Sequence, residues 1–148
     1  MNRDFAEMLA ALSAAGAEYL LVGAHALAAH GVVRATGDLD VWIRPTADNA
    51  SKVWRALLAF GAPLQELTER DLATPDVVFQ IGVVPYRIDL LTSIDGVSFD
   101  EAWPNRTTVR VEGQAIPLIG RDDFLRNKRA TGRLRDLADA EELEKLAT

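Results

Sequence analysis

The sequence contains no cysteine, so the chain can form neither a disulfide nor a thiolate metal site, and a cysteine nucleophile is excluded. Histidine is almost as scarce, because only His25 and His30 occur. Two histidines five positions apart on a helix do not share a face well enough to bind zinc. We therefore expect both imidazoles to be structural or exposed to solvent.

Long apolar runs are also missing, and none is long enough to span a lipid bilayer. Residues 1–16 carry acidic side chains where a secretory signal would be basic. These absences favour a cytoplasmic protein without a membrane partner. The 148 residues are 49% hydrophobic, which predicts a single α/β domain over residues 1–148 with a core of its own.

The net charge of the chain is -6, which argues against a protein that holds nucleic acid through its overall electrostatic field. Strong general binding of nucleic acid is therefore not expected. Arginine and lysine nevertheless concentrate between Arg121 and Arg135. A local cluster of this kind can bind phosphate groups while the rest of the surface stays acidic.

The most informative stretch covers residues 20–44, LLVGAHALAAHGVVRATGDLDVWIR. Its pattern predicts a strand over 19–22, a short helix over 24–30, a loop, and a second strand over 39–43. Side chains alternate between the two faces of a strand, so Asp38 and Asp40 point to the same side. Two carboxylates are thereby expected to converge on one spot.

Two like charges at one spot repel, and burying either without a partner is costly. A divalent cation removes this conflict, and oxygen ligands alone select a hard ion such as Mg²⁺, which often completes its shell with substrate phosphates. The alternative is that Asp38 caps a turn and Asp40 lies on a solvated strand face. An Asp-x-Asp pattern by itself favours this alternative, but the residues that precede Asp38 shift the interpretation toward a metal site.

Gly23-Ala24 followed by Asp38-Leu39-Asp40-Val41 resembles the signature of the nucleotidyltransferase superfamily with the DNA polymerase beta type of catalytic core. The run from Arg34 to Asp40 also resembles the Arg-x-Thr-x-Asp-x-Asp pattern of bacterial minimal nucleotidyltransferases. Ala24 stands where the family usually has serine or glycine, so a triphosphate would have to be held by backbone N–H groups at the helix start. The resemblance covers residues 19–91, and residues 122–146 more loosely.

The resemblance implies a mixed, mainly antiparallel sheet with helices packed on it. It also implies transfer of a nucleoside monophosphate from ATP or another nucleoside triphosphate to a hydroxyl acceptor, with release of pyrophosphate and with Mg²⁺ or Mn²⁺ as cofactor. Asp38 and Asp40 would bind the metal. The third acidic residue that the family takes from a later strand resembles Asp89. From the residues alone, Asp89 could instead pair with Arg87 or another cation.

The same resemblance implies a nucleotide-binding role for Gly23 and Ala24, which would cradle the phosphates. Arg34 and Thr36 are further candidates, because the loop that carries them must pass close to the metal. Lys128 could neutralise the triphosphate, or it could lie on a solvated helix face, and the residues leave both readings open.

The end of the chain resembles the basic stretch and following acidic residues of several minimal bacterial nucleotidyltransferases, at Lys128, Gly132, Arg133, Asp136 and Asp139. The spacing of Arg133 and Asp136 predicts a local ion pair on one helix face. Periodicity predicts an interrupted helical region over 122–146, capped by Asp122 or Asp123. On its second part, Leu134, Leu137 and Ala138, with Leu143 and Leu146 more loosely, are expected to face inward.

The remaining elements are predicted from periodicity and turn residues. They are a helix ending at Gly16, a helix over 47–60 with a stripe at Ala50, Val53, Trp54, Leu57 and Leu58, a short helix near 68–72, a hairpin of strands 77–81 and 86–91 with a turn over 82–85, one helical turn over 99–103, and a hairpin of strands 107–111 and 115–119.

Two other functions fit the sequence. One is a toxin-like nucleotidyltransferase that acts on RNA or protein and is paired with an antitoxin, which growth arrest on expression would favour. The other is a catalytically silent nucleotide-binding or interaction domain, which Ala24 favours and the intact carboxylates disfavour. The acceptor, the preferred base and the oligomeric state stay open, because the residues that select them lie in loops around the site.

Overall fold

The computed structural model describes residues 1–83 and 86–146. Part of the turn expected over 82–85 therefore lies outside the described residues. The helices are α1 (Arg3–Ala14), α2 (Gly23–Ala29), α3 (Ala47–Phe60), α4 (Phe99–Ala102), α5 (Arg121–Thr131) and α6 (Leu134–Lys145), with 3-10 turns η1 (Glu69–Ala73) and η2 (Trp103–Asn105). The strands are β1 (Tyr19–Val22), β2 (Asp38–Ile43), β3 (Val78–Val83), β4 (Tyr86–Leu91), β5 (Thr107–Val111) and β6 (Gln114–Leu118).

The six strands form one sheet in the order β3-β4-β2-β1-β6-β5. Pairs β3/β4, β1/β2 and β5/β6 are antiparallel, while β2/β4 and β1/β6 are parallel. The prediction of a mixed, mainly antiparallel sheet with packed helices is confirmed. The connection from β1 to β2 contains α2, so the start of α2 follows β1 at the edge of the sheet where β2 begins.

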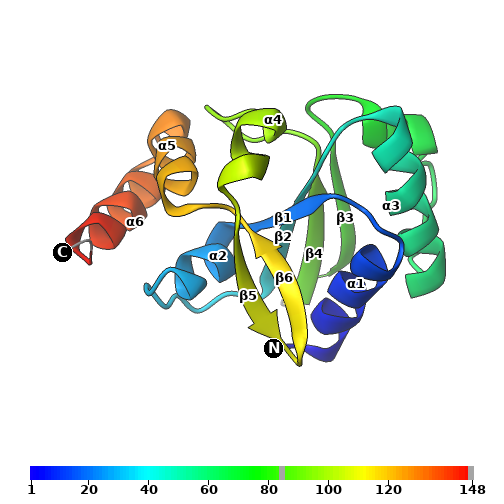
Figure 1. Ribbon diagram of the computed structural model, residues 1–148, viewed down its shortest axis with the longest axis horizontal. Coiled ribbons are helices and arrows are strands. Elements are labelled where there is room, and N and C mark those ends of the chain that lie inside the picture. The colour runs from blue at the N-terminus through cyan, green and yellow to red at the C-terminus, as the bar shows by residue number, and fades with distance from the viewer. Residues whose placement is uncertain (84–85, 147–148) are drawn as a thin grey trace.

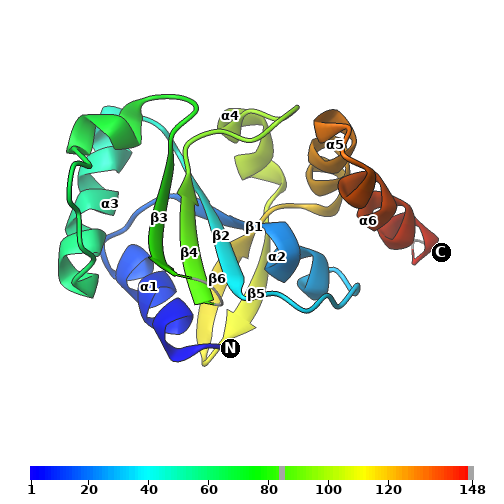
Figure 2. The ribbon, with the colours of Figure 1, turned by 180° about the vertical axis from the view of Figure 1, so that it is seen from behind.

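The helices gather on opposite sides of the molecule (Figures 1 and 2). Helices α1 and α3 contact each other and lie on one side, while α5 and α6 pair on the other side. Helix α6 leads away from the sheet toward the C-terminus. Within the described residues, no helix is both long enough and apolar enough to cross a membrane.

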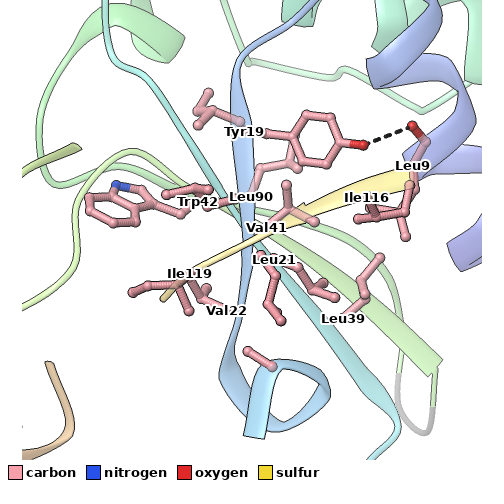
Figure 3. Packing of buried hydrophobic residues seen from close by; sticks show 14 of the residues in the cluster. Leu9, Tyr19, Leu21, Val22, Leu39, Val41, Trp42, Leu90, Ile116 and Ile119 are labelled. Carbon is pink, nitrogen blue, oxygen red and sulfur yellow. Dashed lines mark hydrogen bonds between the residues drawn. The ribbon is translucent and has the colours of Figure 1, made fainter. Parts of the chain in front are cut away.

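The hydrophobic core is centred on β1 and β2, whose apolar side chains are buried on both faces of the sheet. Figure 3 shows Tyr19 directed at α1, where its hydroxyl donates to the Leu9 carbonyl at 3.4 Å. On β2, Trp42 is also buried and packs edge-on against Phe99 at 5.0 Å between ring centroids. Because these central strands are anchored by the core, the residues at their ends are held in place.

Several expectations about side chains are wrong. Leu58 is 57% exposed, and Ala56 takes its place in the buried stripe of α3. Gly120 is the N-cap of α5 and supplies no side-chain cap. Asp123 is buried and accepts from the Asn105 amide at 3.3 Å, so it does not cap the helix.

The expected inward face of α6 is wrong at four of its five positions. Leu134 is 85% exposed and Leu137 is 39% exposed, with Ala138 and Leu146 also outside. Leu143 is buried as expected, but the other buried residues of α6 are Asp136, Asp139 and Ala140. The reason is electrostatic: cations on α5 and on the loop before β2 face this helix, and only its carboxylates can pair with them.

Candidate active site

The strand register brings the acidic residues together. In the parallel pair β2/β4, Asp40 lies directly beside Asp89, and Asp38 lies beside Arg87. In the antiparallel pair β1/β2, Asp40 lies beside Val22, the residue before Gly23. The start of α2 and the three carboxylates therefore meet at one edge of the sheet.

Arg87 holds two of these carboxylates. Its Nε and Nη2 atoms donate to the two oxygens of Asp89 at 2.8 and 3.1 Å, and Nη2 also donates to Asp38 Oδ2 at 3.2 Å. The pairing of Asp89 with Arg87, which the sequence left open, is thus present. Asp89 itself is only 7% exposed, so this paired charge is well shielded from water.

Asp40 is the carboxylate without such a partner. It makes no side-chain hydrogen bond or ion pair within residues 1–83 and 86–146. Burial first, and then the charges of Asp89 and Asp38, raise the pKa of Asp40 to about 6, against smaller opposing effects of Lys128 and Arg87. A cation bound here would oppose this rise in the pKa of Asp40, because it stabilises the ionised form.

Gly23 makes the close approach of Asp40 possible. Its φ angle is +71°, a conformation that side chains rarely adopt. A Cβ atom at this position would lie 2.1 Å from Asp40 Oδ2. The glycine is therefore required both by the backbone conformation and by the carboxylate packed against it.

We expect Gly23→Ala to lower the free energy of unfolding by about 3 kcal/mol or more, because backbone strain and a steric clash add together. Gly16→Ala is the matched control, since Gly16 has a φ of +72° and nothing within 4 Å of its Cβ position. The control should lose only about 1–2 kcal/mol from the backbone conformation. Urea denaturation of both variants measures the difference, and equal losses would show that the Asp40 contact is unimportant.

A second charged cluster lies on α5 and α6. Asp136 is 2% exposed and accepts from Lys128 Nζ at 3.2 Å, from Thr131 Oγ1 at 2.8 Å and from Arg133 Nε at 2.8 Å. The predicted Arg133–Asp136 ion pair is confirmed. Lys128 is not on a solvated face, because its side chain is only 14% exposed.

The loop before β2 is bound to α6 by ion pairs. Arg34 pairs with Asp139 at 3.2 Å and with Glu142 at 3.0 Å. Thr36 Oγ1 accepts from the backbone N–H of Asp38 at 3.1 Å and so shapes the entry into β2. Arg34 therefore joins two parts of the chain, and Thr36 holds the backbone of Asp38.

Two adjoining hollows surround these groups. The carboxylate hollow, of about 480 Å³, is bordered by β2, β4, residues 93–95 and α5, and includes Asp38, Asp40 and Asp89. The loop hollow, of about 280 Å³, lies between α2, residues 34–36 and α6. Both share a set of residues on their walls, namely Gly23, Asp38, Asp40, Lys128, Arg133 and Arg135.

The predicted site residues all reach these walls. Asp89 lines the carboxylate hollow, and Ala24, Arg34 and Thr36 line the loop hollow, while the others line both. Arg135 was missed as a site residue. It is exposed and, in the described part of the chain, has no ion pair or side-chain hydrogen bond. Its only sequence signal is its place at the end of the basic cluster.

The carboxylates suit a divalent metal by their chemistry. Three acidic side chains gather at one edge, and Asp40 has no counter-ion among residues 1–83 and 86–146, which is the arrangement that a hard cation relieves. In the described residues, however, no three acidic or histidine side chains are already arranged around one metal position. The guanidinium of Arg87 contacts Asp38 and Asp89 instead.

The histidines take no part in this site. His30 Nε2 lies 2.8 Å from the Ile119 carbonyl oxygen, and His25 packs edge-on against Phe5 at 5.7 Å between ring centroids. Both contacts are structural, as the sequence led us to expect.

No protein-family model matches the chain, and no curated protein matches its sequence. Solved structures do match. A protein from Thermotoga maritima described as a candidate nucleotidyltransferase is 15% identical with a TM-score of 0.58, over 96% of this chain and 89% of that one. The lincosamide antibiotic adenylyltransferase LnuA, solved with lincomycin bound, is 13% identical with a TM-score of 0.61, over 97% of this chain and 96% of that one.

A third match is an antigenic nucleotidyltransferase-like protein from Paracoccidioides brasiliensis, 18% identical with a TM-score of 0.51, over 97% of this chain and 75% of that one. Each alignment extends over nearly all of this chain, so the likeness includes the strands and helices that border both hollows. At these identities it is a likeness of fold. The chain shares its fold with these solved nucleotidyltransferase structures.

Proposed function

We propose that this protein is a metal-dependent nucleotidyltransferase that moves a nucleoside monophosphate from a nucleoside triphosphate to a hydroxyl acceptor. The observation that carries the proposal is the register of β2 and β4, which sets Asp40 beside Asp89. Asp38 is on the same face of β2, two residues before Asp40. The fold, shared with solved nucleotidyltransferases, supports the proposal. So do the cations Lys128 and Arg135 on the walls of both hollows.

The two hollows suit the two substrates. The loop hollow offers the backbone of Gly23 and Ala24 together with Lys128 and Arg135, which would bind the triphosphate. Arg34 is committed to α6 and would hold the loop in place. The larger carboxylate hollow contains Asp89 and would receive the acceptor.

The reaction joins the acceptor oxygen to the α-phosphorus and breaks the bond to the β-phosphate, so that pyrophosphate leaves. Asp38, Asp40 and Asp89 would hold Mg²⁺ or Mn²⁺, which supplies charge neutralisation of the phosphates and a lower pKa for the attacking hydroxyl. Asp89 would orient that hydroxyl and help remove its proton. Lys128 and Arg135 would offset the negative charge that develops on pyrophosphate.

The deciding experiment incubates the purified protein with each labelled nucleoside triphosphate, Mg²⁺ or Mn²⁺, and a cell extract. The expected result is label in one fraction of the extract, which also identifies the acceptor class, together with release of pyrophosphate. Asp40→Asn protein serves as the control. Absence of label and of pyrophosphate with every triphosphate and both metals would reject the proposal.

Nucleotide binding should depend on the metal. We expect the protein to bind Mg²⁺ or Mn²⁺ weakly, and a triphosphate at least about tenfold more tightly when metal is present, because phosphate oxygens complete its coordination shell. Isothermal calorimetry with and without metal measures both constants. An affinity that is indifferent to metal and to Asp40→Asn would count against the site.

A catalytically silent nucleotide-binding domain is the second candidate, and Ala24 is the observation that favours it, because it offers no side-chain hydroxyl to a triphosphate. Metal-dependent nucleotide binding without transfer to any extract fraction would support this candidate.

A further inference from the structure

We infer that Arg87 is a positioning residue that holds the carboxylates in the metal-free protein and competes with the divalent metal for them. The inference rests on the proposed function, since it concerns the same carboxylates. It assigns to Arg87 a role as an internal counter-ion, which a bound metal must displace from at least one aspartate.

The contacts of Arg87 place its guanidinium where a shared ligand would lie. Its fork closes on both oxygens of Asp89, and its Nη2 atom also reaches Asp38 Oδ2 at 3.2 Å. These oxygens are hard-metal ligands by their chemistry. An oxygen that accepts a guanidinium hydrogen bond has one lone pair fewer to offer to a metal.

The Arg87 guanidinium and a divalent metal are mutually exclusive at these carboxylates, because both are positively charged. A divalent metal bound by Asp38 and Asp89 would stand within a few ångströms of the guanidinium, and like charges so close in a partly shielded site repel strongly. The arginine also meets a need of the metal-free protein. Without it, three aspartates would lie close together with no counter-ion from the part of the chain that the structure describes.

The guanidinium is able to leave without disturbing the sheet. The backbone N–H of Arg87 donates to the Gly37 carbonyl at 3.0 Å, which fixes the strand, but its side chain is 28% exposed and lines the carboxylate hollow. Rotation of the side chain toward that hollow would free Asp38 and Asp89. Such rotamer changes need no change in the fold.

The test compares Mn²⁺ binding, without nucleotide, in the wild type, Arg87→Met and Arg87→Lys, using electron paramagnetic resonance of free Mn²⁺. Arg87→Met should bind Mn²⁺ at least about tenfold more tightly than the wild type, because the competing charge-assisted hydrogen bonds are gone. Arg87→Lys, which keeps the charge without the fork, should fall between them. The same variants are melted with and without Mn²⁺.

Arg44→Met is the matched control. Arg44 also pairs with two acids, Glu18 and Asp100, and its side chain is 18% exposed, but it lies outside both hollows. We expect both methionine variants to melt at a lower temperature without metal. Mn²⁺ should restore the melting temperature of Arg87→Met alone, because only there does the metal replace the lost cation.

The inference would be overturned if Arg87→Met and Arg87→Lys bound Mn²⁺ as tightly as the wild type or more weakly. Arg87 would then either have no effect on metal binding or assist it. The result separates this inference from the proposed function. Tighter Mn²⁺ binding in Arg87→Met without any transfer by the wild type leaves the competition standing and rejects the transferase. Unchanged Mn²⁺ binding in Arg87→Met, together with transfer by the wild type, rejects the competition and supports the transferase.

Discussion

Asp40→Asn is expected to lower the rate of nucleotidyl transfer by about 10³-fold or more, while the protein still folds. Asp40 is the carboxylate with no counter-ion in the described chain and lines both hollows, so it is the ligand most dependent on a metal. Single-turnover transfer and the melting temperature should be measured on one preparation. Asp48→Asn is the control, because Asp48 has an 88% exposed side chain on α3. Transfer within about threefold of the wild type would contradict the role of Asp40.

The same variant should change how stability depends on pH. The pKa of Asp40 is raised from its ordinary 3.8 to about 6. The native protein therefore binds this proton more tightly than the unfolded chain does, and the contribution of Asp40 to stability falls as the pH rises from about 4 to 6. A shift of this size corresponds to about 3 kcal/mol at most, at about 1.4 kcal/mol per pH unit.

The comparison of the two proteins isolates the titration of Asp40 together with its coupling to Asp38 and Asp89, because carboxylates far from Asp40 titrate alike in both. Metal-free Asp40→Asn should gain up to about 3 kcal/mol relative to the wild type between pH 4 and pH 7, and Mg²⁺ should reduce that gain by stabilising ionised Asp40 in the wild type. Urea denaturation at several pH values gives the difference directly. A difference that is constant over this range, or that shrinks as the pH rises, would mean that Asp40 is not destabilised by its surroundings.

Asp136→Ala is expected to have the largest effect on folding, a loss of about 3–5 kcal/mol of unfolding free energy. Asp136 is 2% exposed, and its removal leaves the Lys128 ammonium, with a 14% exposed side chain, without its partner. Glu141→Ala is the control on the same helix. Glu141 forms an exposed pair with Lys145 at 3.8 Å, which contributes about 0.5 kcal/mol or less.

A second substitution tests the cause of this loss. If the stranded ammonium is responsible, Asp136→Ala combined with Lys128→Met should be more stable than Asp136→Ala alone. The pH dependence has a defined sign. Burial opposes ionisation of Asp136, but hydrogen bonds from Thr131, Lys128 and Arg133 and the charge of Lys128 lower its pKa overall. The stabilising effect of ionised Asp136 should therefore be lost only as the pH falls below 3.8, the ordinary pKa of an aspartate. A double variant no more stable than Asp136→Ala would contradict the explanation.

The local elements of the site could be predicted from the sequence because their signals are short in range. Alternation along β2 put Asp38 and Asp40 on one face, and Gly23 marked the end of β1. The strand containing Asp89 was predicted from apolar neighbours on both sides of it. Leu134 and Leu137 show where such signals fail, because hydrophobicity alone predicted them inside and charge placed Asp136 and Asp139 there instead.

By itself the sequence determined which residues could form the site, because residue type and strand or helix period are local properties. The tertiary structure decided how the charges pair. The strand order set Asp40 beside Asp89 and let Arg87 reach Asp38, 49 positions away, while the docking of α6 brought Asp139 to Arg34, 105 positions away. A charge pairs with whichever opposite charge the packing brings within hydrogen-bonding distance, and that distance depends on the whole fold and not on neighbours in the chain.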